Sequence, residues 1–407
     1  MLKRIPVEHL TLGMHIDGFC APWMEHPFWR NHFVLTDPQD IARVRASSVQ
    51  EVWIDTGKGL DTAPAATPEV ASEAAPAITP AAAPTPVRDT APTATAAEYA
   101  RATLICTKAK QAVASMFQEA RLGQAVQTEL AEQLVQEISD SVMRNPSALV
   151  SMVRIKTADD YTYMHSVAVC ALMVSLALQL KLDAAQTRSA GLGGLLHDLG
   201  KALVPVEVLN KPGKLTDAEF AIVQAHPLQG HRLLVECLTD DPAVLDIVLH
   251  HHEKSDGSGY PHRQSGDGIS LLAKMGAVCD VYDAITSDRP YKKGWDPAES
   301  LKKMAEWTNG HLDIQVFHAF VKSLGIYPTG SLLRLGSGRI AVVVEQNGSA
   351  LLKPVVKAFF STKTDLRIPP VLIDLSAPDC KDKIAGREDP AYWRFTDLNQ
   401  LWSGLPG

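Results

Sequence analysis

Apolar residues recur at helical spacing through the middle of the chain, from about Tyr99 to Leu324. Capping signals show where some of these helices begin. Thr216 and Glu219 form a capping box, and Asp241-Pro242 pairs an N-cap with a proline at the first helical position. The pattern predicts a mainly α fold, built around a helical bundle.

The start of the chain has a different pattern. Glu51–Asp55 alternates apolar and polar residues as a half-buried strand does, and Asp37-Pro38 suits the start of a short helix. We therefore expect a small α+β domain over residues 1–60. Residues 61–98 follow as a linker, because more than half of them are Ala or Pro and few are large and apolar.

The end of the chain is strand-like. Arg339–Gln346 and Ser349–Phe360 are rich in Val, Leu, Ile and Phe, and Asn347-Gly348 between them suits a type I′ hairpin turn. These segments predict a short β-rich appendage over residues 326–407. The helical part divides into a connector, residues 99–147, and a main domain, residues 148–325.

Composition narrows the class of protein. The net charge of −7 argues against binding DNA or RNA, which requires a basic surface. The longest apolar run, Val167 to Leu180, is too short for a membrane span and is interrupted by Ser175 and Gln179. Six cysteines without CxxC spacing suit a reducing compartment. We expect a cytoplasmic protein with free thiols.

Histidines carry the main functional signal, because eight of the fourteen lie between His165 and His262. The sharpest unit is the adjacent pair His197-Asp198, which can present an imidazole and a carboxylate to the same metal cluster. A mixed nitrogen and oxygen set suits iron, manganese or another first-row divalent ion. The seven candidate ligands are His165, His197, Asp198, His226, His251, His252 and Asp280.

Seven ligands are more than one ion uses, so we predict two divalent ions, Fe or Mn, with Asp198 between them. A two-metal site activates water and neutralises a phosphodiester. Asp198 and Lys201 are the predicted catalytic residues, and we expect the amine of Lys201 to contact a substrate phosphate. The remaining histidines of the region and its surroundings are interpreted as hydrogen-bonded structural residues: His231, His250, His262, His311 and His318.

Two further segments can contact a substrate. The loop Asp256 to Pro261 would place Gly259, Tyr260 and Pro261 at the mouth of the site, where the aromatic ring can stack on a base. Arg289 and Lys292 follow the ligand Asp280 closely and can meet phosphate or guanine acceptors. Taken alone, the loop is typical of a surface turn, and Arg289 and Lys292 are better interpreted as an exposed basic turn.

Together these motifs resemble the HD-GYP family across roughly residues 150 to 325. In chain order they are Tyr161 to Ser166, His197 to Lys201, Lys211 to Leu215, His226, His251 to Glu253, Asp256 to Pro261 and Asp280 to Tyr291. The first 60 residues also resemble the small domain of unknown function often fused to HD-GYP domains.

The resemblance implies a phosphodiesterase that opens cyclic di-GMP to linear pGpG. It assigns the seven ligands to the metals and Lys201, Arg289 and Lys292 to substrate phosphate, and we add Asp283 to the substrate-binding residues. Members with three metals carry a glutamate four residues before the first histidine, where this chain has Tyr161. We therefore predict a dinuclear site with linear pGpG as the product, and we leave GMP open as a further product.

Two alternatives stay open at the level of sequence. One is hydrolysis of another nucleotide, such as 3′,3′-cyclic GMP-AMP, by the same metal chemistry. The other is a scaffold that binds cyclic di-GMP or a diguanylate cyclase without turnover. The sequence also leaves open a homodimer and other signalling partners.

Overall fold

The protein is described by a computed structural model that divides into two compact units, residues 1–85 and 86–407. Each unit has its own hydrophobic core. The structure describes residues 2–19, 33–36, 38–45, 49, 51–60, 89–124, 126, 128–154, 161–236, 241–288 and 293–404.

The N-terminal unit is a small antiparallel sheet with one helix. Its strands, in the spatial order β1-β4-β2-β3, are β1 (Leu2–Pro6), β4 (Glu51–Asp55), β2 (His15–Phe19) and β3 (Phe33–Val34). The helix α1 spans Pro38–Arg45, after the short 3-10 helix η1 (Val7–His9). Val52 and Ile54 are fully buried whereas Trp53 between them is 41% exposed, which is the alternation expected of β4. The predicted cap Asp37 lies outside the described residues.

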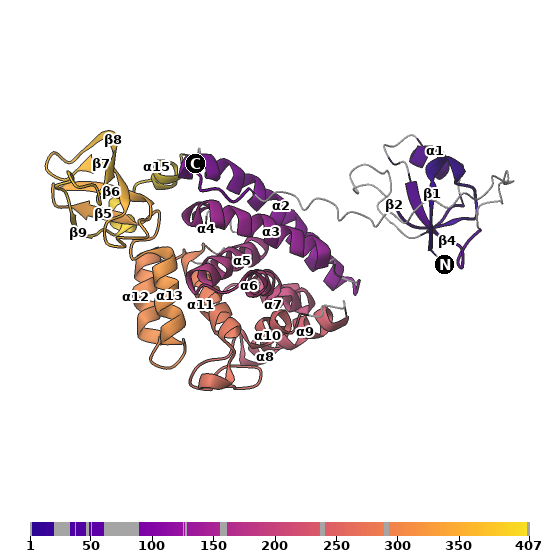
Figure 1. Ribbon diagram of the computed structural model, residues 1–407. Coiled ribbons are helices and arrows are strands. Elements are labelled where there is room, and N and C mark those ends of the chain that lie inside the picture. Colours follow the sequence, from indigo (N-terminus) through magenta and orange to yellow (C-terminus); the bar gives the residue numbers. More distant parts are fainter. Residues whose placement is uncertain are drawn as a thin grey trace, which may run out of the picture. The chain divides into compact units, whose positions relative to one another are not determined.

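The second unit begins as a helical bundle (Figure 1). Its helices are α2 (Thr95–Arg121), α3 (Thr128–Arg144), α4 (Pro146–Met152), α5 (Tyr161–Gln179), α6 (Ala184–Leu196), α7 (Val206–Leu209), α8 (Asp217–Gln224), α9 (His226–Glu236), α10 (Pro242–His250), α11 (Leu271–Thr286), α12 (Pro297–Trp307) and α13 (Ile314–Leu324). The predicted caps Thr216 and Asp241 begin α8 and α10. The mainly α fold is therefore confirmed.

Helix α5 is the centre of the bundle and packs against α2, α3, α4, α6, α11 and α13. Every residue from 167 to 177 is at most 5% exposed, because neighbouring helices cover all of its faces. Within the described part of the chain, α5 is the one helix long and apolar enough to cross a membrane. In its window Thr162–Gln179, 78% of the residues are buried inside the protein, as in the core helix of a globular domain.

The predicted connector packs as part of the bundle, since α2 to α4 contribute to the same core as α5. Helix α2 begins at Thr95, so residues 95–98, which we assigned to the linker, form its first turn. Glu98 in that turn is buried and accepts hydrogen bonds from Ser141 at 2.7 Å and from Arg144 at 2.8 and 2.9 Å. Residues 61–88 lie outside the described part.

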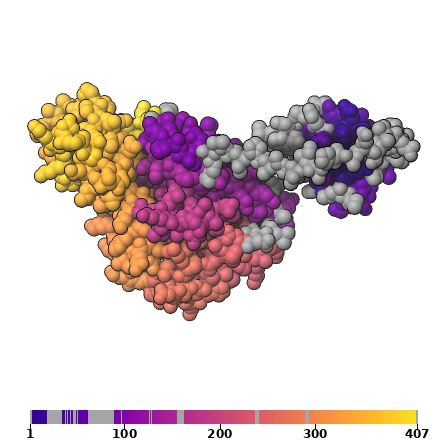
Figure 2. All heavy atoms as spheres, in the orientation of Figure 1, coloured from indigo at the N-terminus to yellow at the C-terminus, as the bar shows by residue number. Residues whose placement is uncertain are grey.

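The C-terminal part is an antiparallel sheet in the order β8-β7-β6-β5-β9, followed by two short helices. Figure 2 shows its yellow atoms lying directly against the helical part, and Ile340, Phe359 and Trp402 join the core of the bundle. The elements are β5 (Leu332–Leu335), β6 (Arg339–Glu345), β7 (Val355–Ser361), β8 (Leu366–Asp374), β9 (Ile384–Arg387), α14 (Pro390–Trp393) and α15 (Leu398–Ser403).

The predicted turn at Asn347-Gly348 is wrong in its length. Strand β6 ends at Glu345 and β7 begins at Val355, so a longer loop joins them. A type I′ turn needs positive φ at both central residues, and the φ angle of Gly348 is not positive. Instead, the Asn347 side chain accepts a hydrogen bond from the Ser349 amide at 3.1 Å, which stabilises a local turn within the loop.

Candidate active site

All seven predicted ligands come together, although they lie on six different helices or helix ends. They form two groups, and within each group the ligand atoms lie within 4.8 Å of one another. The first group is His165 in α5, His197 at the end of α6 and Asp280 in α11. The second is Asp198 before the 3-10 helix η4 (Leu199–Leu203), His226 at the start of α9, and His251 and His252 after α10.

Asp198 joins the two groups, because its two oxygens face different histidines. Its Oδ1 lies 3.2 Å from Nε2 of His226 and 4.0 Å from Nε2 of His251. Its Oδ2 lies 3.4 Å from Nε2 of His197 and 3.6 Å from Nε2 of His165. A carboxylate in this position can bind one cation with each oxygen.

The imidazole rings are oriented by backbone carbonyls. Nδ1 of His226 donates to the Val223 carbonyl at 2.7 Å, and Nδ1 of His251 donates to the Val248 carbonyl at 3.0 Å. In the neutral rings these bonds place the lone pair on Nε2. The two Nε2 atoms are 3.3 Å apart, so two lone pairs face each other unless a cation lies between them.

A cation also explains an unpaired atom at the centre of the site. Oδ1 of Asp198 is buried and makes no hydrogen bond of acceptable geometry, although His226 lies near it. A buried anionic oxygen without a partner is costly. The donor set of imidazoles and carboxylates therefore fits divalent metal ions.

The pKa shifts in the site favour the protonation states that bind metal ions. Burial would raise the pKa of Asp198, but His197 and Lys201 hold it well below its ordinary value. Burial lowers the pKa of His251 and of His252, the latter to about 3 despite the opposing charge of Asp280. Ionised carboxylates and neutral imidazoles are the forms that bind cations.

Asp283, which we assigned to substrate binding, lies against His165 and is not among the residues that line the cavity described below. The side chain follows Asp280 by one turn of α11 and is fully buried, and its Oδ2 accepts a hydrogen bond from Nδ1 of His165 at 2.6 Å. Burial opposes protonation of His165, but Asp280 and Asp283 outweigh it and raise its pKa. Asp283 is thus placed to orient a ligand.

Lys201 extends from η4 and donates to Oδ2 of Asp198 at 2.6 Å. The helix η4 lies close to α9, since a Cβ atom on Gly200 would stand 2.0 Å from the carbonyl oxygen of His226. Only glycine allows this approach, which brings Asp198 and His226 together. The other two predicted phosphate contacts, Arg289 and Lys292, lie outside the described residues.

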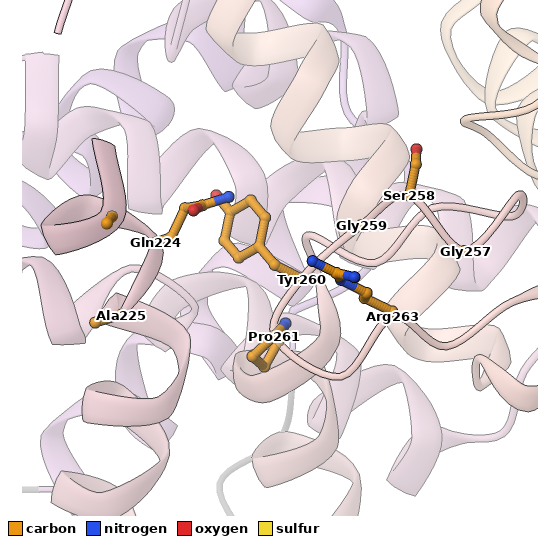
Figure 3. Close-up of a pocket in the computed structure, with 9 residues that line it drawn as sticks. Gln224, Ala225, Gly257, Ser258, Gly259, Tyr260, Pro261 and Arg263 are labelled. Carbon is orange, nitrogen blue, oxygen red and sulfur yellow. The ribbon is translucent and has the colours of Figure 1, made fainter. Parts of the chain in front are cut away.

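The predicted substrate loop lines a cavity of about 620 Å³ (Figure 3). Gly259, Tyr260 and Pro261 form one wall, and the end of α8 forms the other. The Tyr260 ring stacks on the ligand His252 with ring centroids 4.7 Å apart. A Cβ atom on Gly259 would lie 2.4 Å from the amide nitrogen of Lys254, so glycine is required where the loop folds back.

Three residues of this region were missed by sequence reasoning. Glu253 accepts hydrogen bonds from the amides of His262 and Gln264 at 2.7 and 3.0 Å and so holds the loop. The sequence feature that could have identified Glu253 is its place directly after two predicted ligand histidines. Gln224 and Arg263 line the cavity, and nothing in their local sequence indicates this.

His250 and His262 belong to a separate pair outside the two ligand groups. Nδ1 of His250 bonds to Asp246 at 2.7 Å, and its Nε2 lies 3.1 Å from Nδ1 of His262. With Glu253 they form a third group of possible ligand atoms, although both Glu253 oxygens already hold backbone amides.

A helical bundle in which a His-Asp pair joins two groups of imidazole and carboxylate ligands defines the class of HD-domain phosphohydrolases. The chain matches the HD domain over residues 133–316 and a domain of unknown function, DUF3391, over residues 2–131. It is 54% identical over 406 residues to cyclic di-GMP phosphodiesterase PA4108 of Pseudomonas aeruginosa, covering 100% of this chain and 96% of that protein. The chain belongs to the HD-GYP phosphodiesterase family.

More distant relatives cover only part of the chain. The 3′3′-cGAMP-specific phosphodiesterase 1 of Vibrio cholerae is 34% identical over 185 residues, which are 45% of this chain and 42% of that protein. The solved structure of Bd1817, a HDG"Y"P protein from Bdellovibrio bacteriovorus, is 18% identical with a TM-score of 0.46. It covers 79% of this chain and 98% of that one.

Proposed function

We propose that this enzyme hydrolyses cyclic di-GMP to linear pGpG with two divalent cations, Fe or Mn. The observation that carries the proposal is the pair of ligand groups joined by the two oxygens of Asp198. Similarity over the whole chain to a protein named as a cyclic di-GMP phosphodiesterase supports the substrate. The complete ligand set weighs against the scaffold alternative, because binding without turnover does not need it.

Two cations held by the two groups would supply Lewis-acid activation of water and neutralise charge on the phosphodiester. The chain itself provides the remaining functions. Asp198, whose pKa is held low, stays ionised across the neutral range and fixes the spacing of the two groups. Lys201 lies 2.6 Å from Asp198 and is 23% exposed, so its ammonium group can meet a phosphate oxygen while remaining beside the carboxylate.

The product that we propose depends on the number of metal ions that the site would hold. Tyr161 stands four residues before His165 in the sequence, at the first position of α5. A phenol there is a poorer ligand for a hard divalent ion than a carboxylate. We therefore propose a dinuclear site that releases linear pGpG and does not proceed efficiently to GMP.

We also propose that the enzyme works in the cytoplasm. Four cysteines of the described part, Cys106, Cys170, Cys279 and Cys380, are free thiols. Free thiols suit a reducing compartment.

The test is anaerobic turnover of cyclic di-GMP after loading with Fe(II) or Mn(II), with the products separated by chromatography and the metal measured by elemental analysis. Asp198→Ala should lower kcat by roughly 10²–10³-fold or more, because it removes the carboxylate shared by the two groups. Asp379→Ala, an exposed aspartate of the C-terminal part, is the control.

Three outcomes count against the proposal. A fully metal-loaded wild-type protein that does not hydrolyse cyclic di-GMP contradicts the substrate. Rapid formation of GMP contradicts the dinuclear site inferred from Tyr161. A folded Asp198→Ala protein with wild-type rates contradicts the bridging role.

A further inference from the structure

The cavity beside the ligand groups has walls that are continuous with them. Ala225 in one wall immediately precedes the ligand His226, and Tyr260 in the other stacks on the ligand His252. A molecule in this cavity of about 620 Å³ therefore lies next to the groups that would hold the metals.

Two long polar side chains line the cavity, and neither is engaged by a polar partner in the described structure. Gln224 and Arg263 have no side-chain hydrogen bond or ion pair with any described residue. In Figure 3 the Tyr260 ring stands between the Gln224 amide and the Arg263 guanidinium. The remaining lining residues are small or apolar: Ala221, Ala225, Gly257, Ser258, Gly259 and Pro261.

The backbone at Arg263 adopts a conformation that glycine would adopt more easily, with φ of 55°. Arg263 is exposed, so packing does not explain its presence there. The amides on both sides of it, of His262 and Gln264, are held by Glu253. The guanidinium is thus attached to a fixed point of the loop, which reduces the entropy lost when it binds.

We propose that this cavity is a guanine-binding subsite in which the base stacks on Tyr260 and Arg263 donates to its O6 and N7. The inference rests on the proposed function and names the residue that selects the base. Guanine presents two acceptors at O6 and N7, which match the planar fork of arginine. Adenine presents a donor at N6 in place of O6, so the same fork meets only one acceptor.

The test compares Arg263→Gly and Arg263→Lys with the wild type on cyclic di-GMP, 3′,3′-cyclic GMP-AMP and cyclic di-AMP. Glycine suits positive φ, so Arg263→Gly removes the side chain without straining the loop. Lysine keeps the charge but has no fork. Arg394→Gly is the matched control, because Arg394 is also an exposed arginine with positive φ, 51°, in the C-terminal part.

We expect Arg263→Gly to lower the preference for cyclic di-GMP over cyclic di-AMP by roughly 5- to 100-fold. Arg263→Lys should lose most of that preference, and Arg394→Gly should keep it. The preference is measured as the ratio of kcat/KM values and, independently, as the ratio of Kd values from calorimetry on the same proteins.

An equal loss for all three nucleotides would overturn the proposal and assign Arg263 to phosphate. Unchanged ratios would overturn it as well. If the wild type binds the nucleotides but hydrolyses none, the proposed function fails while the Kd ratios still decide the subsite. Absence of binding by the wild type would refute both.

Discussion

At the residue scale, the site depends on groups that hold the ligands as much as on the ligands. His165 is the clearest case: its Nε2 lies 3.0 Å from Asp280, while its Nδ1 donates to Asp283 at 2.6 Å. A carboxylate behind a ligand histidine fixes the ring and makes it a better donor to a metal. We therefore propose that Asp283 positions the His165 ring.

Asp283→Ala should weaken metal binding by roughly 10- to 100-fold, because His165 loses the acceptor that orients its ring. Competition with a chelator, followed by elemental analysis, measures the affinity. Asp283→Asn keeps a carbonyl acceptor in place and should lose less. If both variants fold and bind metal as the wild type does, Asp283 has no positioning role.

At the scale of elements, helix α2 precedes the matched HD domain and packs against two elements that carry site residues. The ring of Phe117 in α2 packs edge-on against Tyr163 near the start of α5, with centroids 5.6 Å apart. Arg121 at the end of α2 donates to the Ala202 carbonyl in η4 at 3.3 Å. Helix α2 thus supports both the helix that carries His165 and the turn that carries Lys201.

The first turn of α2 is tied to α3 by a buried ion pair, in which Glu98 is fully buried and Arg144 is 9% exposed. Glu98→Ala should lower the free energy of unfolding by about 3 kcal/mol, because Arg144 loses its carboxylate in a buried setting. Urea denaturation measures this change.

Lys108→Ala is the control for that measurement, since it removes an exposed ion pair with Glu137. We expect it to cost less than about 1 kcal/mol. Equal effects of the two substitutions would show that burial of the Glu98 ion pair adds nothing to the free energy of unfolding.

At the scale of the whole molecule, the extent of each hydrophobic core decides which parts of the chain can be removed. Residues 1–85 contain a core cluster of their own, and residues 86–407 contain theirs. The C-terminal sheet, by contrast, shares a core with the bundle through Ile340, Phe359 and Trp402. Removing the sheet should therefore expose apolar surface of the bundle.

A protein of residues 86–407 should therefore keep a melting temperature within a few degrees of the full chain and bind the same amount of metal. A protein that ends at residue 325 should aggregate or melt far lower, because the core residues of the sheet are missing. Calorimetry and elemental analysis measure both. Loss of fold or metal in residues 86–407 would contradict the independence of that unit.

The sequence alone predicted what depends on local chemistry. Capping residues place the starts of α8 and α10, the alternation of Glu51–Asp55 predicts β4, and the ligand residues are recognisable because few structural roles concentrate so many imidazoles and carboxylates. The helical HD-type bundle and the family follow from the same motifs.

Tertiary structure decided what depends on approach between distant segments. His165 and Asp280 meet only because α5 packs against α11, and the same packing brings Asp283 against Nδ1 of His165. Arg263 reaches the cavity because Glu253 folds the loop beside it. Caps and periodicity act over a few residues, whereas the contacts between α5 and α11 depend on the packing of whole helices, which no short stretch of sequence specifies.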